Sequence, residues 1–311
     1  MADSAGRWQD DLYDLLRRAL PDDCYRTGHT LVGIEASRER VAAVFSDRTR
    51  ASGDLLIAAD GISSIVRGLM LPEAKPAYAG YVAWRGLLRE CELSPDAHRT
   101  LADRFSLYLP DGEEILGYPV AGPGNSLRAG SRYYNFVWYR PVSEDELPGL
   151  LTDQHGNRHA ISLPPDTMNP GAVEQVRRDA ARCLPPPFAE VVRGVPTPFI
   201  QAIYEVRASR LVFGRVAMIG DAACLARPHV GTGVTKAAGD AIALAQALSE
   251  CGDDPEAGLM RFERLRLDYG RKVFERSRYL GQLIRSGAAA GIPLDSIHDQ
   301  ILTLTAVAPE A

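Results

Sequence analysis

RVAMIGDAACLARPHVGTGVTKAAGDAIALAQAL, residues 215–248, is the stretch that decides the fold. It starts with a compact apolar run, Val216 to Ile219, which predicts a short buried strand of a parallel sheet. Gly220-Asp221 places a carboxylate at the carboxyl end of that strand. Pro228 and Gly231-Thr232-Gly233 then bring bare backbone to a helix start, where free N–H groups favour anionic or electron-rich ligand atoms.

A long helix follows this glycine-rich turn. Its apolar residues recur with the 3.6-residue period of an amphipathic helix. They are Val234, Ala237, Ala238, Ala241, Ile242, Ala245 and Leu248. Because this face is mostly alanine, we expect it to pack closely on the sheet.

The composition is that of an ordinary globular protein. A chain of 311 residues predicts about two domains, at roughly 150 residues per domain. The net charge of −5 gives no electrostatic case for a nucleic-acid partner.

The first residues carry no signal-peptide pattern and no apolar run is long enough to span a membrane, so a cytoplasmic protein is expected. The five cysteines are scattered, so we expect reduced thiols, no disulfide framework and no metal site.

A second strand–turn–helix unit lies earlier in the chain. Residues 54–58 predict a short strand that ends at Asp60-Gly61, and a helix is expected over residues 62–70. Before it we expect a helix over residues 8–20 and a β-hairpin of residues 30–35 and 40–45. Further expected elements are strands at 81–88, 105–109, 115–120, 133–140 and 199–207, and helices at 144–151, 172–183 and 255–286. The order predicts an α/β domain with an antiparallel-sheet domain inserted into it.

Asp60 and Asp221 are the two candidate ligand positions. Each alone is equally well explained as a helix cap, since aspartate before a helix is common for that reason. Together they favour a ligand site, because ligands bind at the carboxyl ends of strands in open α/β sheets.

The two units together resemble a known family. Residues 55–67, LLIAADGISSIVR, look like the Asp-Gly motif of the flavin-dependent aromatic hydroxylases, the single-component monooxygenases with the p-hydroxybenzoate hydroxylase fold. Residues 215–248 look like the Gly-Asp motif of the same family, in the same order and at a similar separation. Further phrases resemble the 2,6-dihydroxypyridine 3-monooxygenase branch; they are residues 12–15, 31–34, 78–86 and 227–229.

The resemblance implies a fold and its domains. The fold class is α/β, with a three-layer FAD/NAD(P)-binding-type domain and an inserted antiparallel-sheet substrate domain. The FAD-binding domain would comprise residues 1–75 and 198–311, and the substrate domain residues 76–197.

The resemblance also implies the cofactor-binding residues. FAD would be bound by Asp60, Gly61, Arg67, Gly220, Asp221, Pro228, Gly231, Thr232, Gly233 and Val234. In the family, the aspartate of Gly-Asp holds the ribityl and pyrophosphate part of FAD, and the loop after it lies against the isoalloxazine ring. A helix start aimed at that ring would stabilise the negative charge of reduced flavin.

Candidates for substrate binding and catalysis are fewer. Trp84, Arg85 and Tyr118 are the candidate substrate-pocket residues, although a packing role explains Trp84 and Tyr118 as well. His229 is the one candidate acid or base, and a structural role suits it at least equally.

The resemblance implies an NAD(P)H-dependent monooxygenase. NAD(P)H would reduce FAD, O₂ would add at the flavin C4a to give a hydroperoxide, and an electron-rich hydroxylated aromatic or pyridine ring would take up the oxygen. A homodimer is a family expectation.

The sequence departs from the family in two places. Cys224-Leu225 stands where many relatives carry His-Pro, and no Gly-x-Gly-x-x-Gly motif for the ADP half of FAD occurs in the 311 residues. A truncated reading frame, a misassigned start or a separate chain that supplies this unit would each explain the second departure. An alternative is therefore a truncated or partner-dependent flavin-domain protein without activity of its own. A flavin oxidoreductase that does not hydroxylate is a third.

Overall fold

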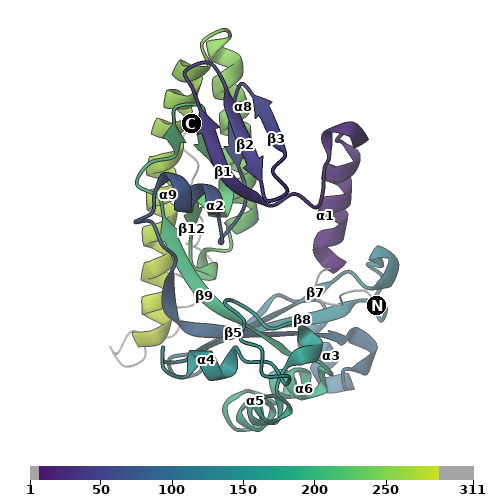
Figure 1. The fold of residues 1–311 in the computed structure, drawn as a ribbon. Helices are drawn as coiled ribbons and strands as arrows, with labels where there is room; N and C mark the ends of the chain where they lie inside the picture. Colours follow the sequence, from purple (N-terminus) through teal and green to yellow (C-terminus); the bar gives the residue numbers. More distant parts are fainter. Residues whose placement is uncertain (1–6, 287–311) are drawn as a thin grey trace. The chain divides into compact units, whose positions relative to one another are not determined.

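The computed structural model describes residues 7–286, and these form two compact units (Figure 1). Unit 1 contains residues up to Tyr25 and Gly80–Ile203. Unit 2 contains Arg26–Ala79 and the chain from Tyr204 onward. The chain passes between the units within strands β5 (Ala77–Arg89) and β9 (Phe199–Arg207). The predicted α/β class is confirmed, whereas the domain boundaries at residues 75/76 and 197/198 stay predictions.

Unit 2 is built on a small sheet with the strand order β10-β11-β4. Strand β11 (Val216–Met218) pairs in parallel with β4 (Leu56–Ala58), with Met218 opposite Ala58, and antiparallel with β10 (Val212–Phe213). All three residues of β11 are fully buried, as a central strand requires. The predicted strands of the two strand–turn–helix units are therefore neighbours. The chain leaves both at the same edge of the sheet.

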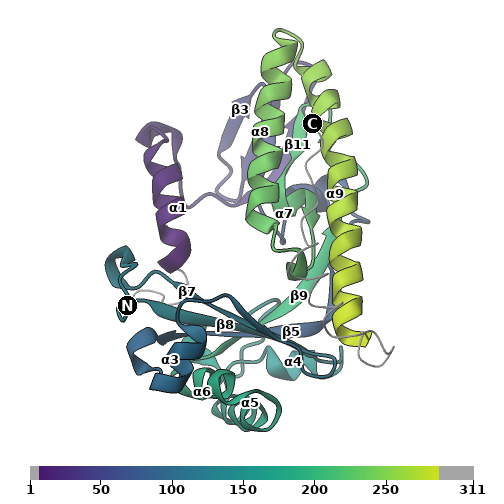
Figure 2. The same cartoon turned by 180° about the vertical axis from the view of Figure 1, so that it is seen from behind.

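A second sheet and the helices complete unit 2. Strands β1 (Leu31–Ala36), β2 (Val41–Phe45) and β3 (Arg50–Gly53) form an antiparallel sheet, which confirms the hairpin and adds a third strand. Figures 1 and 2 show this sheet on one side of β11 and helix α8 on the other. The helices are α2 (Ile65–Met70), α7 (Gly220–Ala223), α8 (Gly233–Cys251) and α9 (Pro255–Ser286).

The predicted packing face of α8 is wrong. The helix buries Lys236, Asp240, Leu244 and Ala247. Most of the expected stripe faces water instead: Val234 is 59% and Ile242 57% exposed, whereas Leu248 at its end is partly buried against the core. Alanine methyl groups contribute little burial energy. The buried face instead packs on α9, which lies beside α8 (Figure 2), and contributes Leu244 and Ala247 to one core with Phe262.

Unit 1 is a twisted antiparallel sheet with helices on one face. Its strand order is β9-β5-β8-β7-β6, where β8 is Tyr133–Pro141, β7 is Glu114–Val120 and β6 is Ser106–Tyr108. Strand β12 (Cys224–Leu225) pairs with the last two residues of β9. Both views show α3 (Pro95–Leu101), α4 (Leu147–Leu150), α5 (Pro170–Cys183) and α6 (Pro186–Gly194) below this sheet, while helix α1 (Arg7–Arg18) belongs to the same unit (Figures 1 and 2).

Three expectations for the helices of unit 1 need correction. Only Leu147–Leu150 is helical within the helix expected at 144–151, and α3 was not expected. Helix α6 was not expected either. Pro186 and Pro187 open it, because a missing N–H costs nothing in a first helical turn.

Candidate functional site

Asp60 accepts hydrogen bonds from the first turn of helix α2, whose N-cap residue is Ser64. One carboxylate oxygen accepts from the Ser64 hydroxyl at 2.6 Å, and the other from the backbone N–H groups of Ile65 and Val66 at 2.8 and 3.2 Å. Gly61 takes a positive φ of 72° in the turn before the helix. Both carboxylate oxygens are therefore engaged within the motif, in agreement with the capping role that the sequence left open. The cofactor role of Asp60 and Gly61 stays a prediction.

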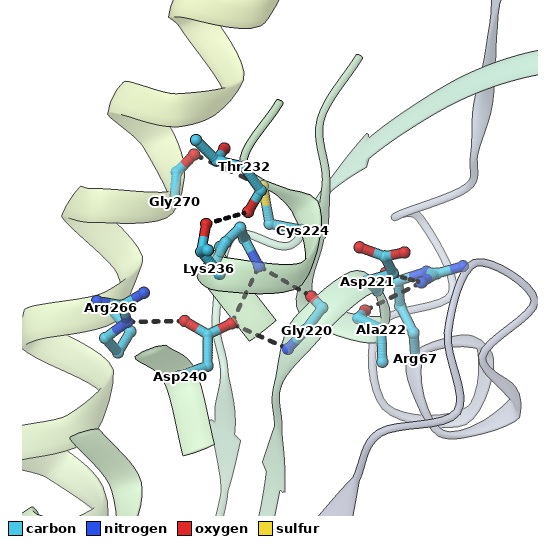
Figure 3. A network of polar contacts seen from close by, with 11 residues as sticks. Arg67, Gly220, Asp221, Ala222, Cys224, Thr232, Lys236, Asp240, Arg266 and Gly270 are labelled. Atoms are coloured by element: carbon cyan, nitrogen blue, oxygen red, sulfur yellow. Dashed lines mark hydrogen bonds and ion pairs between the residues drawn. The ribbon is translucent and has the colours of Figure 1, made fainter. Parts of the chain in front are cut away.

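Arg67 joins the two motifs. Its side chain is buried and donates to four backbone carbonyl oxygens, which belong to Ile62, Ala74, Asp221 and Ala222. The contact with Ala222 measures 2.9 Å and crosses from the Asp-Gly unit to the Gly-Asp unit (Figure 3). Burial lowers the pKa of the guanidinium, and the Asp60 carboxylate opposes this. Arginine nevertheless stays charged at neutral pH, so each of these bonds is charge-assisted.

A buried charge cluster holds the turn that follows β11 (Figure 3). Gly220 adopts a positive φ of 58°. Its N–H donates to one Asp240 carboxylate oxygen at 2.9 Å, and its carbonyl accepts from Lys236 Nζ at 3.1 Å. Lys236 is 3% and Asp240 4% exposed, and they pair at 3.0 Å. Arg266 Nε reaches the other oxygen of Asp240 at 2.7 Å.

This cluster was missed from the sequence. The only signal was a Lys–Asp pair four residues apart in an alanine-rich helix. Such pairs are usually exposed to solvent. The face of α8 that we expected to be buried does not include Lys236 and Asp240, so the prediction placed this pair in solvent.

Asp221 presents a free carboxylate. Among the described residues, none donates a hydrogen bond to its side chain, which is partly buried. Burial raises the pKa of this carboxyl; nearby Lys236 lowers it and Asp240 raises it again. A partly buried carboxylate without a donor fits a ligand that brings hydroxyl groups.

The loop before α8 combines exposed backbone with an unused hydroxyl. Gly231 has a φ of 63°, and a Cβ at Gly231 or Gly233 would meet no atom within 4 Å. Thr232 Oγ1 is buried, and no described residue pairs with it. No side chain caps the first turn of α8. Free donors at the positive end of a 19-residue helix suit an electron-rich ligand edge.

His229 lies in the short 3₁₀ turn Pro228–Val230 and is 9% exposed. It packs on α9, since a Cβ at Gly281 would come within 3.2 Å of its ring. The guanidinium of Arg227 pairs with buried Glu205 at 2.7 Å, and the backbone N–H of Arg227 donates to Ser277 Oγ at 3.1 Å. These contacts fix the loop on β9 through Glu205 and on α9 through Ser277 and Gly281. The catalytic role of His229 stays a prediction.

The three candidate substrate residues of unit 1 lie on two faces of one sheet. Neighbours on a strand alternate between faces, so Trp84 and Arg85 point in opposite directions. Trp84 is opposite Trp138 on β8 and is 5% exposed. Arg85 shares the other face with Tyr118, as the registers of β5, β8 and β7 require. The structure therefore brings Arg85 and Tyr118 to one face and leaves Trp84 out.

Arg85 and Asn135 carry spare donors on that shared face. Arg85 Nη1 donates to Gln201 Oε1 at 3.1 Å, while its Nε is buried without a partner among the described residues. Asn135 is 3% exposed, and its Nδ2 has no partner within hydrogen-bond geometry in the described chain. Tyr118 lies opposite Asn135 and stacks on Phe105; burial raises its pKa, while the neighbouring Arg85 and Asn135 lower it. Asn135 and Gln201 were not predicted.

Residues 7–286 contain neither a cluster of metal ligands nor a membrane-spanning helix. No group of three or more His, Cys, Asp or Glu side chains could hold a metal ion there. None of the described helices has the length and apolar character to cross a membrane.

Two models of protein families match the chain. One, described as FAD binding domain-like, matches residues 78–205. The other, described as FAD binding domain, matches residues 200–277.

The chain is also similar to named monooxygenases. It is 33% identical to the 2,6-dihydroxypyridine 3-monooxygenase of Paenarthrobacter nicotinovorans, over 90% of this chain and 69% of that protein. It is 28% identical to the 3-amino-4-hydroxybenzoate 2-monooxygenase of Streptomyces cremeus, over 88% of this chain and 60% of that protein. The solved structure of 2,6-dihydroxypyridine-3-hydroxylase from Arthrobacter nicotinovorans matches with a TM-score of 0.84 at 33% identity, covering 89% of this chain and 70% of that one.

Proposed function

Since the chain belongs to the FAD-dependent aromatic hydroxylases, the monooxygenases with the p-hydroxybenzoate hydroxylase fold, we propose that it hydroxylates an electron-rich aromatic or heteroaromatic ring with NAD(P)H and O₂. The observation that carries this proposal is the pair of neighbouring strand ends in unit 2. Arg67 ties them together, and Asp221 offers a free carboxylate beside them.

FAD fits the residues of unit 2. The Asp221 carboxylate lacks a donor, and ribityl hydroxyls are donors of the right kind. The unused Thr232 hydroxyl and the open backbone of Gly231 and Gly233 leave polar groups for the ring edge. When bound, FAD supplies the redox and oxygen chemistry, which protein side chains cannot.

The chain's own residues would bind and orient. Asp221 would accept hydrogen bonds from the ribityl chain. The start of α8, with Gly233 and Val234, would face the electron-rich edge of the isoalloxazine ring and stabilise negative charge there. Pro228 and Gly231 would set the path of the loop, and the Glu205–Arg227 ion pair would hold it against β9.

The substrate would be bound by the face of the unit 1 sheet that carries Arg85. The unused donors on Arg85 Nε and Asn135 Nδ2 would pair with acceptor oxygens of a hydroxylated ring, and Tyr118 would contact the ring. A buried donor without a partner costs about 1–3 kcal/mol, which an acceptor on the ligand would recover. Trp84 is not included, because it lies on the helix-covered face.

A direct test is to add FAD to the purified chain, remove free flavin by desalting and record the visible flavin absorbance. Retained flavin, NAD(P)H oxidation stimulated by hydroxylated pyridines or benzoates, and a product one oxygen atom heavier are expected. Oxidation of NAD(P)H that yields only hydrogen peroxide with every ring tested would favour a non-hydroxylating flavin oxidoreductase. A protein that retains no flavin would contradict activity of this chain by itself.

Two variants test the residue assignments, and the first has a matched control. Asp221→Ala should weaken FAD binding by about tenfold or more, which is the loss of one hydrogen bond to a charged group. The control Asp268→Ala removes an exposed carboxylate on α9 and should leave FAD affinity unchanged. Arg85→Met should raise the KM for the ring substrate by roughly tenfold with FAD retained. If Arg85→Met leaves KM unchanged, the substrate face is assigned wrongly.

Assembly and location stay predictions. A homodimer would appear by analytical ultracentrifugation of the purified chain. A separate chain that supplies an ADP-binding unit would co-purify with it and raise its FAD affinity. Cytoplasmic location can be checked by cell fractionation.

A further inference from the structure

The buried charges beside Gly220 point to a role beyond helix packing. We propose that Lys236, Asp240 and Arg266 form a positioning triad, which holds the Gly220 peptide groups and thereby directs the Asp221 carboxylate toward the cofactor. The proposal rests on the assignment of Asp221 to FAD binding. The triad itself need not touch the cofactor.

The contacts converge on one glycine. Gly220 is held by its N–H through Asp240 and by its carbonyl through Lys236, so both peptide groups that flank its Cα are fixed (Figure 3). With a φ of 58°, this residue makes the turn between β11 and α7, and Asp221 follows at once. Asp240 also receives Arg266 from α9. One carboxylate thus connects the end of β11 with α8 and α9.

The charged side chains of Lys236, Asp240 and Arg266 are buried, and a purely structural contact rarely uses buried charges. Charges removed from water cost several kcal/mol each, and well-packed apolar residues at such places are often as stable or more so. Apolar packing, however, would not fix the orientation of a peptide group. The polar triad supplies directional bonds that apolar packing lacks.

The charges also balance around Asp221. Lys236 and Arg266 carry two positive charges and Asp240 one negative charge, which leaves one positive charge beside the Asp221 carboxylate. Lys236 favours the ionised form of Asp221, whereas burial, which has the largest effect, and Asp240 raise the pKa of this carboxyl. An ionised Asp221 is the stronger acceptor for hydroxyl groups.

A triple variant separates positioning from stability. In K236M/D240L/R266M no buried charge is left without a partner, so the unfolding midpoint should fall only by the effect of the two hydrogen bonds that Gly220 loses. We expect amide hydrogen exchange of residues 219–223 to accelerate by tenfold or more. FAD, measured by flavin fluorescence, should bind at least tenfold more weakly. D268N/K272M, which removes a partly exposed Lys–Asp pair four residues apart on α9, is the control and should change neither quantity.

Each outcome decides the proposal. If the variant exchanges its amide hydrogens and binds FAD as the unchanged protein does, the proposal is overturned. It is also overturned if the faster exchange and weaker FAD binding are fully explained by a lower overall stability of the variant. Faster exchange with unchanged FAD affinity would support the hold on the Gly220 peptide groups and overturn its effect on the cofactor. If the unchanged protein binds no FAD, the proposed function fails, and faster exchange alone then supports the hold on Gly220. If the triple variant does not fold, K236M carries the same readouts, because it leaves Asp240 paired with Arg266.

Discussion

Replacing Arg67 by methionine should destabilise unit 2 while leaving unit 1 intact. Methionine keeps much of the buried hydrocarbon but donates no hydrogen bond. Four backbone carbonyls lose their donor, among them those of Ala222 and Ala74, which are held at 2.9 and 3.1 Å. Each buried acceptor left without a partner costs about 1–3 kcal/mol, part of which water or local relaxation recovers. We therefore expect a loss of about 3–5 kcal/mol in the free energy of unfolding of unit 2.

The chain offers an internal control for this measurement. Trp84 and Trp138 both lie in unit 1, so their fluorescence reports that unit in a urea titration. Hydrogen exchange of β11 and α8 reports unit 2. Exchange in these elements should accelerate in Arg67→Met, while the tryptophan transition stays in place. The control Arg50→Met removes an exposed ion pair with Glu35 and should cost less than about 0.5 kcal/mol.

One result would refute the role given to Arg67. If β11 and α8 of Arg67→Met exchange as slowly as in the unchanged protein, the four contacts do not hold the two motifs together. Arg67→Lys adds a graded test. It restores the charge but cannot reach several carbonyls at once, so its exchange rate should lie between those of the methionine variant and the unchanged protein.

Three further predictions concern single side chains. The bond to Arg132 lowers the pKa of Glu90 to about 2 from its ordinary 4.5. Its stabilisation is therefore complete above pH 4.5 and is lost as pH falls toward 2, so Glu90→Gln should flatten the acid side of a urea-midpoint profile. Burial raises the pKa of the Cys224 thiol to about 11, so iodoacetamide should modify exposed Cys91 in the folded protein and Cys224 only after unfolding, as read by mass spectrometry. Glu205→Gln leaves a buried guanidinium without its carboxylate and should cost about 3–5 kcal/mol in chemical denaturation.

The sequence predicted the elements that carry strong local signals. The apolar run at Val216 and the similar run before Asp60 were identified as strands, and their parallel pairing follows from the two strand–turn–helix units. The long antiparallel strands of unit 1 were predicted as well, since aromatic and β-branched residues dominate them.

Side-chain direction was predicted less well. The buried face of α8 was missed because it begins with two charged residues, Lys236 and Asp240. Their partner Gly220 lies 16 and 20 residues away in the sequence, and Asp240 also pairs with Arg266 on another helix. Charged residues are assigned to solvent by default, and only three-dimensional contacts reveal a buried pair. Trp84 and Arg85 were grouped as neighbours in sequence, although strand alternation separates them.

The water-facing stripe of α8 bears on how the purified protein is handled. Val234 and Ile242, with the alanines between them, leave an apolar surface without cover among the described residues, and β4 has a hydrogen-bonded strand on one edge only. Open strand edges and apolar patches invite contacts between molecules as concentration rises. Light scattering should therefore increase with concentration, and charged substitutions such as Ile242→Lys should keep the protein monodisperse without disturbing the buried side of the helix.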